Sequence, residues 1–387
     1  MARKLLEGIR VIDMTVWFTG PLTTQVLADC GAEVIRLGTS TRTQGAGGGG
    51  RAINKKSITL NFRSPKGLEL AYKLVAKSDV VVENHAAGTL TRRGMGYQDL
   101  KKVKPDIIYL STCMQGQTGP YAAHAAFGHM LTALSGFNQI TGWPDKEPGW
   151  LAAYTDFVAP RFHAVSILGA LEYRRRTGKG QYLDCSQNEG GMQFMAPAIL
   201  DYTANKRVAG RMGNKCTYAA PHDVYPCAGN DTWCAISVFT DEEWKSFCNV
   251  IGSPKLAGDP RFATLLARKE HEEELDKMVG EWTKNRQPVD VMNLMQAAGV
   301  AAGLCETNEY QMEVDPQLKA RNYFYNLVDS EGETLRGNPG VQFTLSKTPF
   351  ERHIGSEMGG DNDYVYKEIL GLSDAEVAQL MEEKVID

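Results

Sequence analysis

The fold is decided by the stretch Gly8-Ile-Arg-Val-Ile-Asp13-Met-Thr15-Val-Trp-Phe-Thr-Gly20-Pro-Leu22-Thr-Thr-Gln-Val-Leu-Ala-Asp29-Cys-Gly31-Ala-Glu-Val-Ile-Arg-Leu37. It begins with a short apolar strand that ends at Asp13, and the turn after that strand closes on Gly20 and Pro21. A helix is predicted over 22–29 and a second strand over 31–37. Strand, helix and strand in this order form a β-α-β unit, which opens a doubly wound parallel sheet. The sequence therefore predicts an α/β fold.

Two loops near the start of the chain are candidates for anion binding. The turn before the first helix can offer backbone N–H groups to a phosphate or acyl oxygen, but it lacks the G-x-G-x-x-G dinucleotide fingerprint. The run Gly45-Ala-Gly-Gly-Gly-Gly50 is followed by Arg51, not by Lys-Ser or Lys-Thr, and no strand leads straight into it. This run is therefore interpreted as a flexible surface loop and not as a phosphate loop.

Further strands are predicted over 79–83 and 107–111, and polar loops follow the strand ends. Solvation alone explains any single basic residue in these loops. Taken together, they suit a ligand with several phosphates at the carboxyl edge of the sheet. The basic residues concerned are Lys55, Lys56, Arg63, Arg92 and Arg93.

Length and composition limit the class of protein. A chain of 387 residues is long enough for two domains, and a net charge of -4 argues against nucleic acid as the main partner. No apolar run approaches the roughly 20 residues of a membrane span, and no signal peptide is evident, so a soluble, cytoplasmic protein without a membrane partner is expected. The eight cysteines contain no C-x-x-C pair, and no histidines have metal-ligand spacing. We therefore expect reduced thiols, no disulfide framework and no metal site.

The stretch from Trp150 to Gly180 places a lone carboxylate, Asp156, at the start of a helix. Small and apolar residues at Ala164, Ile167, Leu168 and Leu171 have the spacing of a buried helix face. Three arginines and then Gly178 end this helix. A carboxylate at a helix start is most often a cap, so this window alone favours capping for Asp156.

The whole chain resembles the class III CoA-transferases, which include formyl-CoA and carnitine CoA-transferases and the related α-methylacyl-CoA racemases. The motifs that carry the resemblance run in the same order along almost the full length: Gly8-Ile-Arg-Val-Ile-Asp13, Gly20-Pro21, Asn54-Lys55-Lys56-Ser57-Ile, Val82-Glu-Asn84, Gly116-Gln-Thr-Gly-Pro120, Thr155-Asp156, Arg176-Thr-Gly-Lys-Gly-Gln181, Gly258-Asp-Pro-Arg-Phe262 and Asp315-Pro-Gln-Leu-Lys-Ala-Arg321.

The resemblance implies a Rossmann-like doubly wound large domain that both ends of the chain build, with a smaller α+β domain between them. The expected boundaries are 1–205 for the first part of the CoA-binding domain, 206–315 for the small domain and 316–387 for the return to the large domain. Two subunits are expected to interlock. We therefore expect a homodimer, with a paralogous partner subunit as an alternative, because some members of the family work as hetero-oligomers.

In the family that the chain resembles, the aspartate at the position of Asp156 is the nucleophile. A carboxylate can attack a thioester carbonyl to give a mixed anhydride and CoA thiolate, and the thiolate can then form an aspartyl-CoA thioester. An aspartate is already ionised at pH 7 and needs no general base. The implied activity moves CoA from an acyl-CoA such as succinyl-CoA to a carboxylic acid. Coenzyme A thioester is then a substrate, and no permanently bound cofactor is expected.

The resemblance also assigns CoA contacts to residues of this chain: Phe18, Thr19, Leu60, Arg63, Asn84, His85, Ala86 and Arg92. The sequence departs from the family pattern after the second strand, where Gly38 and Thr39 replace an acidic residue and an arginine. Arg36 or Arg42 is the candidate substitute for that nucleotide contact. No Gly-rich closing loop is evident in the small domain.

His129 supports a second interpretation of the site. In Phe127-Gly128-His129-Met130 it stands where the racemases carry a histidine that works with an aspartate as a pair of bases. However, Met130 replaces the racemase aspartate, and Tyr154-Thr155-Asp156-Phe157 is closer to the transferases. The transferase is therefore favoured and the racemase stays as the alternative. His129 itself is a candidate catalytic residue, an acyl-pocket residue or a plain core histidine.

Overall fold

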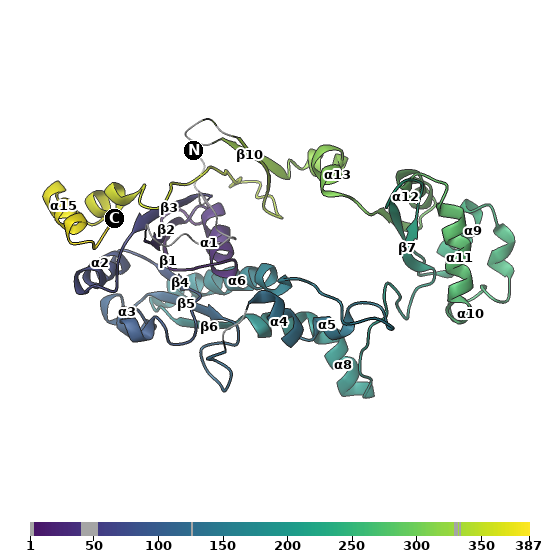
Figure 1. Cartoon of the computed structure of the whole chain (residues 1–387), viewed down its shortest axis with the longest axis horizontal. Helices are drawn as coiled ribbons and strands as arrows, with labels where there is room; N and C mark the ends of the chain where they lie inside the picture. Colours follow the sequence, from purple (N-terminus) through teal and green to yellow (C-terminus); the bar gives the residue numbers. More distant parts are fainter. Residues whose placement is uncertain (1–3, 40–52, 125–126, 329–331, 333) are drawn as a thin grey trace. The chain divides into compact units, whose positions relative to one another are not determined.

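A computed structural model describes residues 4–39, 53–124, 127–328, 332 and 334–387 of the chain. The Cα packing divides the chain into two compact units (Figure 1). The first unit comprises Met1–Asn138, Trp150–Ala209 and Ala320–Asp387, and the second comprises Gln139–Gly149 and Gly210–Lys319. The Gly-rich run 45–50, Arg51 and Arg42 lie outside the described residues, so the structure does not test those interpretations.

The first unit is built on a six-stranded sheet in the order β3-β2-β1-β4-β5-β6, in which all paired strands run parallel. The predicted α/β fold is therefore confirmed. The strand order reverses between β1 and β4, and in sheets of this kind ligands bind outside the carboxyl ends of the strands near such a reversal. The strands are β1 Arg10–Asp13, β2 Glu33–Gly38, β3 Lys55–Thr59, β4 Val80–Glu83, β5 Ile108–Cys113 and β6 Tyr182–Ser186.

Helices cover both faces of this sheet, because the strands carry apolar side chains on both sides. Val11, Val34 and Ile108 face a layer that contains Leu27 of α1 (Thr19–Asp29) and Ile167 of α6 (Tyr154–Thr177). Ile12, Ile35 and Val81 point the other way, toward a second layer. That layer is formed by α2 (Pro65–Ala76), α3 (Tyr97–Val103), the π-helical turn Tyr364–Ile369 and α15 (Asp374–Glu382).

Shorter elements complete the first unit. The helix α15 begins at a capping box that Ser373 and Glu376 form. The strands β10 and β11 form an antiparallel pair. The remaining elements are η1 Thr91–Arg93, α4 Gly128–Leu134, α5 Phe137–Ile140, α7 Gln187–Met192, η2 Gln193–Met195, α8 Ala196–Asn205, α14 Pro316–Ala320, β10 Phe324–Val328 and β11 Thr334–Pro339.

The second unit has a core of its own around Trp244, Phe247, Phe262 and Leu275. Its three strands pair antiparallel in the order β7-β8-β9. The elements are β7 His222–Pro226, β8 Trp233–Ser237, α9 Asp241–Val250, η3 Pro254–Gly258, α10 Leu265–Glu270, α11 Glu272–Thr283, α12 Pro288–Ala297, β9 Ala301–Leu304 and α13 Asn308–Glu313. The second unit therefore combines helices with an antiparallel sheet, which is the α+β composition expected for the middle of the chain.

The structure corrects two local expectations. The first helix begins at Thr19, not at Leu22, so Thr19 and Gly20 form part of its first turn. Asp156 is not the cap of α6, because the helix begins at Tyr154 and Ala153 holds the N-cap position without a side-chain hydrogen bond. The Asp156 carboxylate is instead turned toward other elements of the first unit. Gly178 ends α6 with a left-handed φ of 72°, as the sequence predicts.

Candidate active site

Asp156 lies in the first turn of α6 and is partly buried. Its Oδ1 accepts a hydrogen bond of 2.9 Å from Thr19 Oγ1 and a second, short one from Gln187 Nε2. Thr19 opens α1 and Gln187 opens α7, so three helix starts meet at one carboxylate. Burial raises the pKa of Asp156, whereas the hydrogen bonds from Thr19 and Gln187 and the charge of His129 oppose that rise.

Gly128 lies directly against the Asp156 carboxylate. A Cβ added at Gly128 would stand 2.2 Å from Oδ2 and 2.4 Å from Cγ of Asp156. Any side chain at position 128 would therefore displace the carboxylate. The carbonyl of Gly128 accepts hydrogen bonds from Thr132 Oγ1 at 3.0 Å and from Thr155 Oγ1 at 3.3 Å, which fixes the start of α4 beside the start of α6.

A cavity of about 170 Å³ opens at this carboxylate. Its wall combines polar groups with the aromatic rings of Trp17, Phe18 and Phe127. Phe18 packs against Phe157 with ring centroids 5.8 Å apart, and Trp17 meets Phe127 edge-on at 5.5 Å. The rings place apolar surface beside the carboxylate, and a reactive acyl intermediate needs apolar surroundings because water would hydrolyse it. The other lining residues are Thr19, Asn84, Ala86, Thr112, Cys113, Met114, Ala122, His124, Gly128, Asp156 and Gln187.

A larger cleft of about 1060 Å³ shares Ala86 with this cavity. It runs along the carboxyl ends of β1, β2 and β3, and its wall includes Leu60, Arg63 and His85. Gly38 and Thr39 line it at the end of β2, and Arg93 and Lys384 add positive charge. The acidic residue Asp387 also lies in the wall. A long ligand with phosphates at one end and a reactive group at the other fits a cleft that continues into a small cavity.

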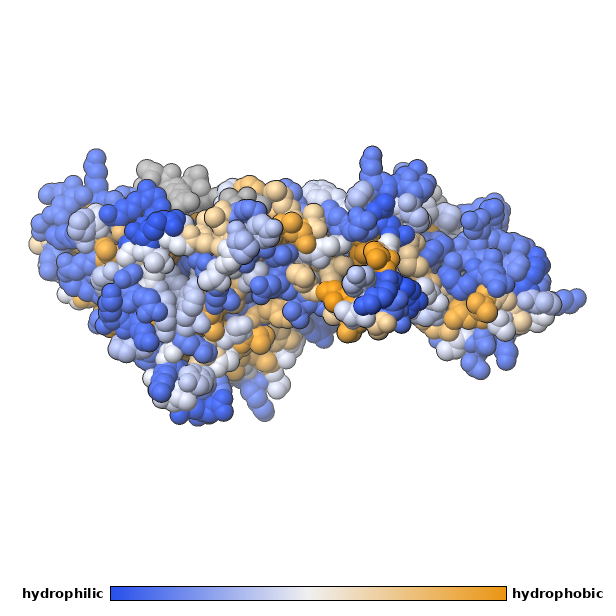
Figure 2. Space-filling model, turned by 90° about the horizontal axis from the view of Figure 1, so that it is seen from below, coloured by the Kyte–Doolittle hydropathy of each residue, from blue (hydrophilic) through white to orange (hydrophobic). Residues whose placement is uncertain are grey.

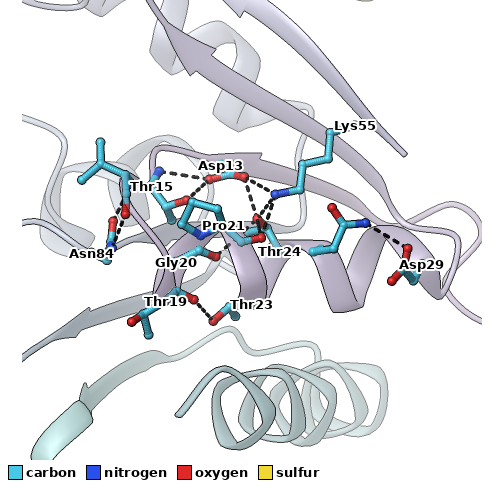
Figure 3. A network of polar contacts seen from close by, with 12 residues as sticks. Asp13, Thr15, Thr19, Gly20, Pro21, Thr23, Thr24, Asp29, Lys55 and Asn84 are labelled. Carbon is cyan, nitrogen blue, oxygen red and sulfur yellow. Dashed lines mark hydrogen bonds and ion pairs between the residues drawn. The ribbon is translucent and has the colours of Figure 1, made fainter. Parts of the chain in front are cut away.

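A buried ion pair fixes the loop between β1 and α1 (Figure 3). Lys55 Nζ lies 3.1 Å from Asp13 Oδ2 and donates to the Pro21 carbonyl at 2.8 Å. Burial opposes the ionisation of Asp13, but Lys55 and the hydroxyls of Thr15 and Thr24 hold its pKa below the ordinary value. Because Lys55 holds the Pro21 carbonyl and Thr15 bonds to Asp13, this network sets the path of the loop that presents Thr19.

Asn84 and His163 support the same loop from other sides. The Asn84 side chain accepts from Val16 N and donates to Val16 O, both at 2.7 Å. His163 is buried on α6 between Thr23 Oγ1 at 3.2 Å and Thr112 Oγ1 at 3.3 Å. Burial lowers the pKa of His163 to about 4, so the ring is neutral at pH 7. The Thr23 hydroxyl also donates to the Thr19 carbonyl at 2.8 Å.

The structure brings together most of the residues that the sequence singled out. Asp156, Phe18, Thr19, Asn84 and Ala86 line the cavity, and Leu60, Arg63, His85 and Ala86 line the cleft. Three of the predicted site residues line neither the cavity nor the cleft: Arg36, Arg92 and His129. Arg36 is only 6% exposed and its Nε has no hydrogen-bond partner within the described part of the chain. Arg92 turns back onto Ala87 O and Thr89 Oγ1, and its neighbour Arg93 lines the cleft.

His129 lies on α4 with an exposed side chain that stacks on Phe127, with ring centroids 6.3 Å apart. Within the described residues, no hydrogen bond joins His129 to Asp156. Gln187 and Gly128, which do contact the carboxylate, carried no signal in the sequence. Both are placed by tertiary packing of the short helices α7 and α4.

Three further observations concern the described residues. No group of three or more His, Cys, Asp or Glu side chains is placed among them to hold a metal ion. All eight cysteines are free thiols. None of the helices in the described ranges combines the length and apolar character that a membrane crossing requires.

Comparison with known proteins identifies the family. A family model described as CoA-transferase family III matches residues 6–360. The chain is 34% identical to the succinyl-CoA–D-citramalate CoA-transferase of Chloroflexus aurantiacus, over 98% of both chains. It is 31% identical to the beta subunit of the succinyl-CoA–L-malate CoA-transferase of the same organism, again over 98% of both. A crystal structure of a CAIB/BAIF family protein from Brucella suis matches with a TM-score of 0.84 and 30% identity, over 95% of this chain and 100% of that one. This chain belongs to CoA-transferase family III.

Proposed function

We propose that this protein moves CoA from an acyl-CoA donor such as succinyl-CoA to a carboxylic acid, with Asp156 as the covalent nucleophile. The observation that carries the proposal is a partly buried carboxylate in a small cavity that adjoins a long cleft. The two relatives described above are named as succinyl-CoA-dependent enzymes, which supports succinyl-CoA as the donor. Coenzyme A thioester acts here as a substrate and not as a resident cofactor.

The reaction follows from the residues at the cavity. The Asp156 carboxylate attacks the thioester carbonyl carbon, the C–S bond breaks and the CoA thiolate leaves with the electron pair. The thiolate then attacks Cγ of Asp156 and releases the donor acid, which leaves an aspartyl-CoA thioester. The acceptor acid reverses both steps. Each exchange keeps the energy of the thioester bond, and the ring-lined cavity protects the anhydride from water.

The CoA moiety belongs in the cleft at the ends of β1, β2 and β3. Arg63 is exposed there, and its guanidinium makes no hydrogen bond or ion pair within the described residues, so it is available to a phosphate. Arg93 and Lys384 extend the positive charge along the wall. In this arrangement Arg93 has the role that the resemblance assigns to Arg92. His85 and Ala86 flank the passage from the cleft to the cavity.

The first unit is the CoA-binding domain in this proposal. Its strand order of β3-β2-β1-β4-β5-β6 supports a Rossmann-like description. The residues Ala320–Asp387 return to the first unit after the second, which supports a large domain made from both ends of the chain. The second unit is the small domain.

A homodimer with interlocked subunits completes the proposal. Apolar residues are exposed on α6, η2 and α8, among them Val165 (66% exposed) and Leu200 (65%). Figure 2 shows hydrophobic side chains gathered in clusters on the molecular surface. Exposed apolar residues that gather on one surface are typical of an interaction surface. Because one relative is named as a beta subunit, a paralogous partner subunit is the other outcome of an assembly measurement.

The reaction is tested by isotope exchange between succinyl-CoA and labelled succinate, with and without hydroxylamine. We expect label to enter the thioester pool, and hydroxylamine to inactivate the enzyme only when succinyl-CoA is present, because it traps the activated aspartyl group. Asp156→Asn removes the nucleophile and abolishes both effects. If deuterium from solvent is incorporated at the α-carbon of an acyl-CoA and no acyl exchange occurs, the result supports the racemase alternative instead.

A further inference from the structure

We infer that the two oxygens of the Asp156 carboxylate have different, fixed roles. Oδ2 attacks the thioester and leaves with the donor acid. Oδ1 stays on Asp156 through every turnover and takes the negative charge when thiolate attacks Cγ, with Thr19 and Gln187 as its oxyanion hole. The inference rests on the proposed function of Asp156 as the nucleophile.

The first observation is that both hydrogen-bond donors converge on the same oxygen. Thr19 Oγ1 donates to Oδ1 at 2.9 Å, and Gln187 Nε2 makes its short contact with that atom as well. Within the described residues no hydrogen bond ends on Oδ2. An oxygen with two donors is the less nucleophilic of the pair, because its lone pairs are engaged and its charge is stabilised. Oδ2 keeps its lone pairs for attack.

The second observation is the close approach of Gly128 on the other side of the carboxylate. The Cβ that Gly128 lacks would stand 2.2 Å from Oδ2 and 2.7 Å from Oδ1. The carboxylate occupies the space that a side chain at position 128 would take, and Oδ2 is its nearest atom to that space. The two oxygens therefore have different surroundings: Oδ1 accepts from a hydroxyl and an amide, and Oδ2 packs against a glycine and accepts no hydrogen bond within the described residues.

The roles follow when the oxygens are traced through the reaction. In the first step Oδ2 forms a bond to the acyl carbon, and the C–S bond breaks. In the second step thiolate attacks Cγ, the electron pair of the Cγ=Oδ1 bond moves onto Oδ1, and the Cγ–Oδ2 bond breaks as the tetrahedral intermediate collapses. Oδ2 thus departs in the released acid. A carboxylate that attacks the aspartyl-CoA thioester supplies a new oxygen in its place.

The two donors act in the second step, when negative charge develops on Oδ1. Hydrogen bonds that are aimed at a developing oxyanion stabilise the transition state more than the ground state, and removal of one such donor lowers kcat by about 10²-fold to 10³-fold. The same two bonds must break before the carboxylate can rotate by half a turn and exchange its oxygens. The donors therefore stabilise the oxyanion and also keep Oδ1 from becoming the attacking atom.

The test measures how many 18O atoms the Asp156 carboxylate takes up. The full-length enzyme is incubated for many turnovers with succinyl-CoA and a large excess of succinate that carries 18O in both carboxylates. This exchange needs only the donor half-reaction, so the acceptor acid need not be known. Turnover is followed as 18O entering the thioester carbonyl of succinyl-CoA. The peptide that contains Asp156 is then isolated, and its mass is measured by mass spectrometry.

We expect one 18O atom in that peptide, however long the exchange runs. Two atoms would overturn the inference and leave the covalent mechanism standing, because they mean that the carboxylate rotates between turnovers. No 18O while succinyl-CoA still becomes labelled would contradict the proposed function itself. The two failures are therefore distinguishable in a single spectrum.

Variants test whether Thr19 and Gln187 are responsible. We expect Thr19→Val and Gln187→Leu each to lower kcat by about 10²-fold. The double variant is compared with wild type after equal numbers of turnovers. We expect its Asp156 peptide to contain two 18O atoms, whereas the wild-type peptide contains one. The matched controls are Thr334→Val on β11 and Gln379→Leu on α15, whose side chains are exposed and make no contact with Asp156 in the described structure. A folded double variant that still takes up a single 18O would contradict the roles of the two donors.

Discussion

The Asp156 carboxylate combines two opposing demands at the scale of one residue. It must be ionised to attack, yet its partial burial raises its pKa. The hydrogen bonds from Thr19 and Gln187 counter the effect of burial. The same two contacts therefore favour the charged form of the nucleophile and hold it in position.

This balance gives a pH dependence with a definite sign. The ionised form is the active one, so kcat/KM falls in acid as pH drops through the raised pKa of Asp156. Gln187→Leu removes a contact that lowers this pKa, so we expect the acid limb of the kcat/KM profile to move to higher pH. Gln379→Leu, at an exposed position on α15, is the matched control and should leave the limb in place. A limb that moves to lower pH in Gln187→Leu would contradict the assignment.

Lys55 is a second residue whose effect is measurable. Lys55→Met leaves the fully buried Asp13 without its cation, and removal of one partner of a buried pair costs about 3 to 5 kcal/mol. The neighbouring Lys56 is partly exposed and lies 3.7 Å from Asp361, so Lys56→Met should cost less than about 1 kcal/mol. Urea unfolding at pH 7 measures both.

The effect of Lys55 also depends on pH. The pKa of Asp13 is lowered in the folded state, so its contribution to stability is present above the unfolded value of about 3.9 and is lost as pH falls further. We therefore expect the difference between wild type and Lys55→Met to shrink below about pH 4. An equal difference at pH 7 and in strong acid would contradict the ion pair as its cause.

At the scale of elements, the site depends on short helices that start close together. The sequence predicted that loops at the strand ends would bind a ligand, and the structure brings Thr19, Asn84 and Ala86 together in the wall of one cavity, because parallel strands end at one edge of a sheet. Gln187 and Gly128 could not be predicted. They lie 31 and 28 residues from Asp156 in the sequence, and no periodic pattern joins three separate helix starts.

Gly128 at the start of α4 can be compared with Gly169 inside α6. Gly128→Ala forces a Cβ to within 2.2 Å of Oδ2, so we expect transfer activity to fall by about 10²-fold or more as the carboxylate is displaced. Gly169 has nothing within 4 Å of its missing Cβ, so Gly169→Ala should keep full activity and stabilise the helix by up to about 1 kcal/mol. Steady-state kinetics and thermal unfolding of both variants measure this. Full activity of Gly128→Ala would contradict the close contact.

The basic residues show what a sequence can and cannot indicate about a binding cleft. Arg63 lines the cleft as predicted, because it follows directly on the end of β3. Arg36 points into a buried environment, because it alternates with Ile35 and Leu37 along β2 and both faces of that strand are covered. Arg92 and Arg93 are neighbours in one short 3-10 helix, and only backbone geometry decides that Arg93 faces the cleft.

At the scale of the whole molecule, the parallel sheet and its reversal between β1 and β4 bring the cleft and the cavity to one edge of the first unit. The sequence predicted this architecture well, because apolar strands alternate with helices throughout the N-terminal half. The residue patterns did not indicate an oligomeric state, and only the resemblance to the family predicted a dimer.

The assembly is tested on the exposed apolar residues of α6 and α8. Val165→Glu with Leu200→Glu places two charges on the surface that we propose a second subunit covers, so we expect a shift from dimer toward monomer in sedimentation equilibrium. Met381→Glu on α15 is the control, because this residue is exposed and apolar but lies on another helix. A double variant that stays fully dimeric would contradict the proposed surface.

The central claim is that the Asp156 carboxyl group becomes covalently bound to CoA. The most direct measurement is a rapid acid quench of the enzyme with succinyl-CoA, followed by proteolysis and mass spectrometry. We expect a peptide that contains Asp156 and has gained the mass of CoA less one water molecule, and we expect this adduct to disappear when excess succinate is added before the quench. Transfer activity without any such adduct, or an adduct on a residue other than Asp156, would contradict the account.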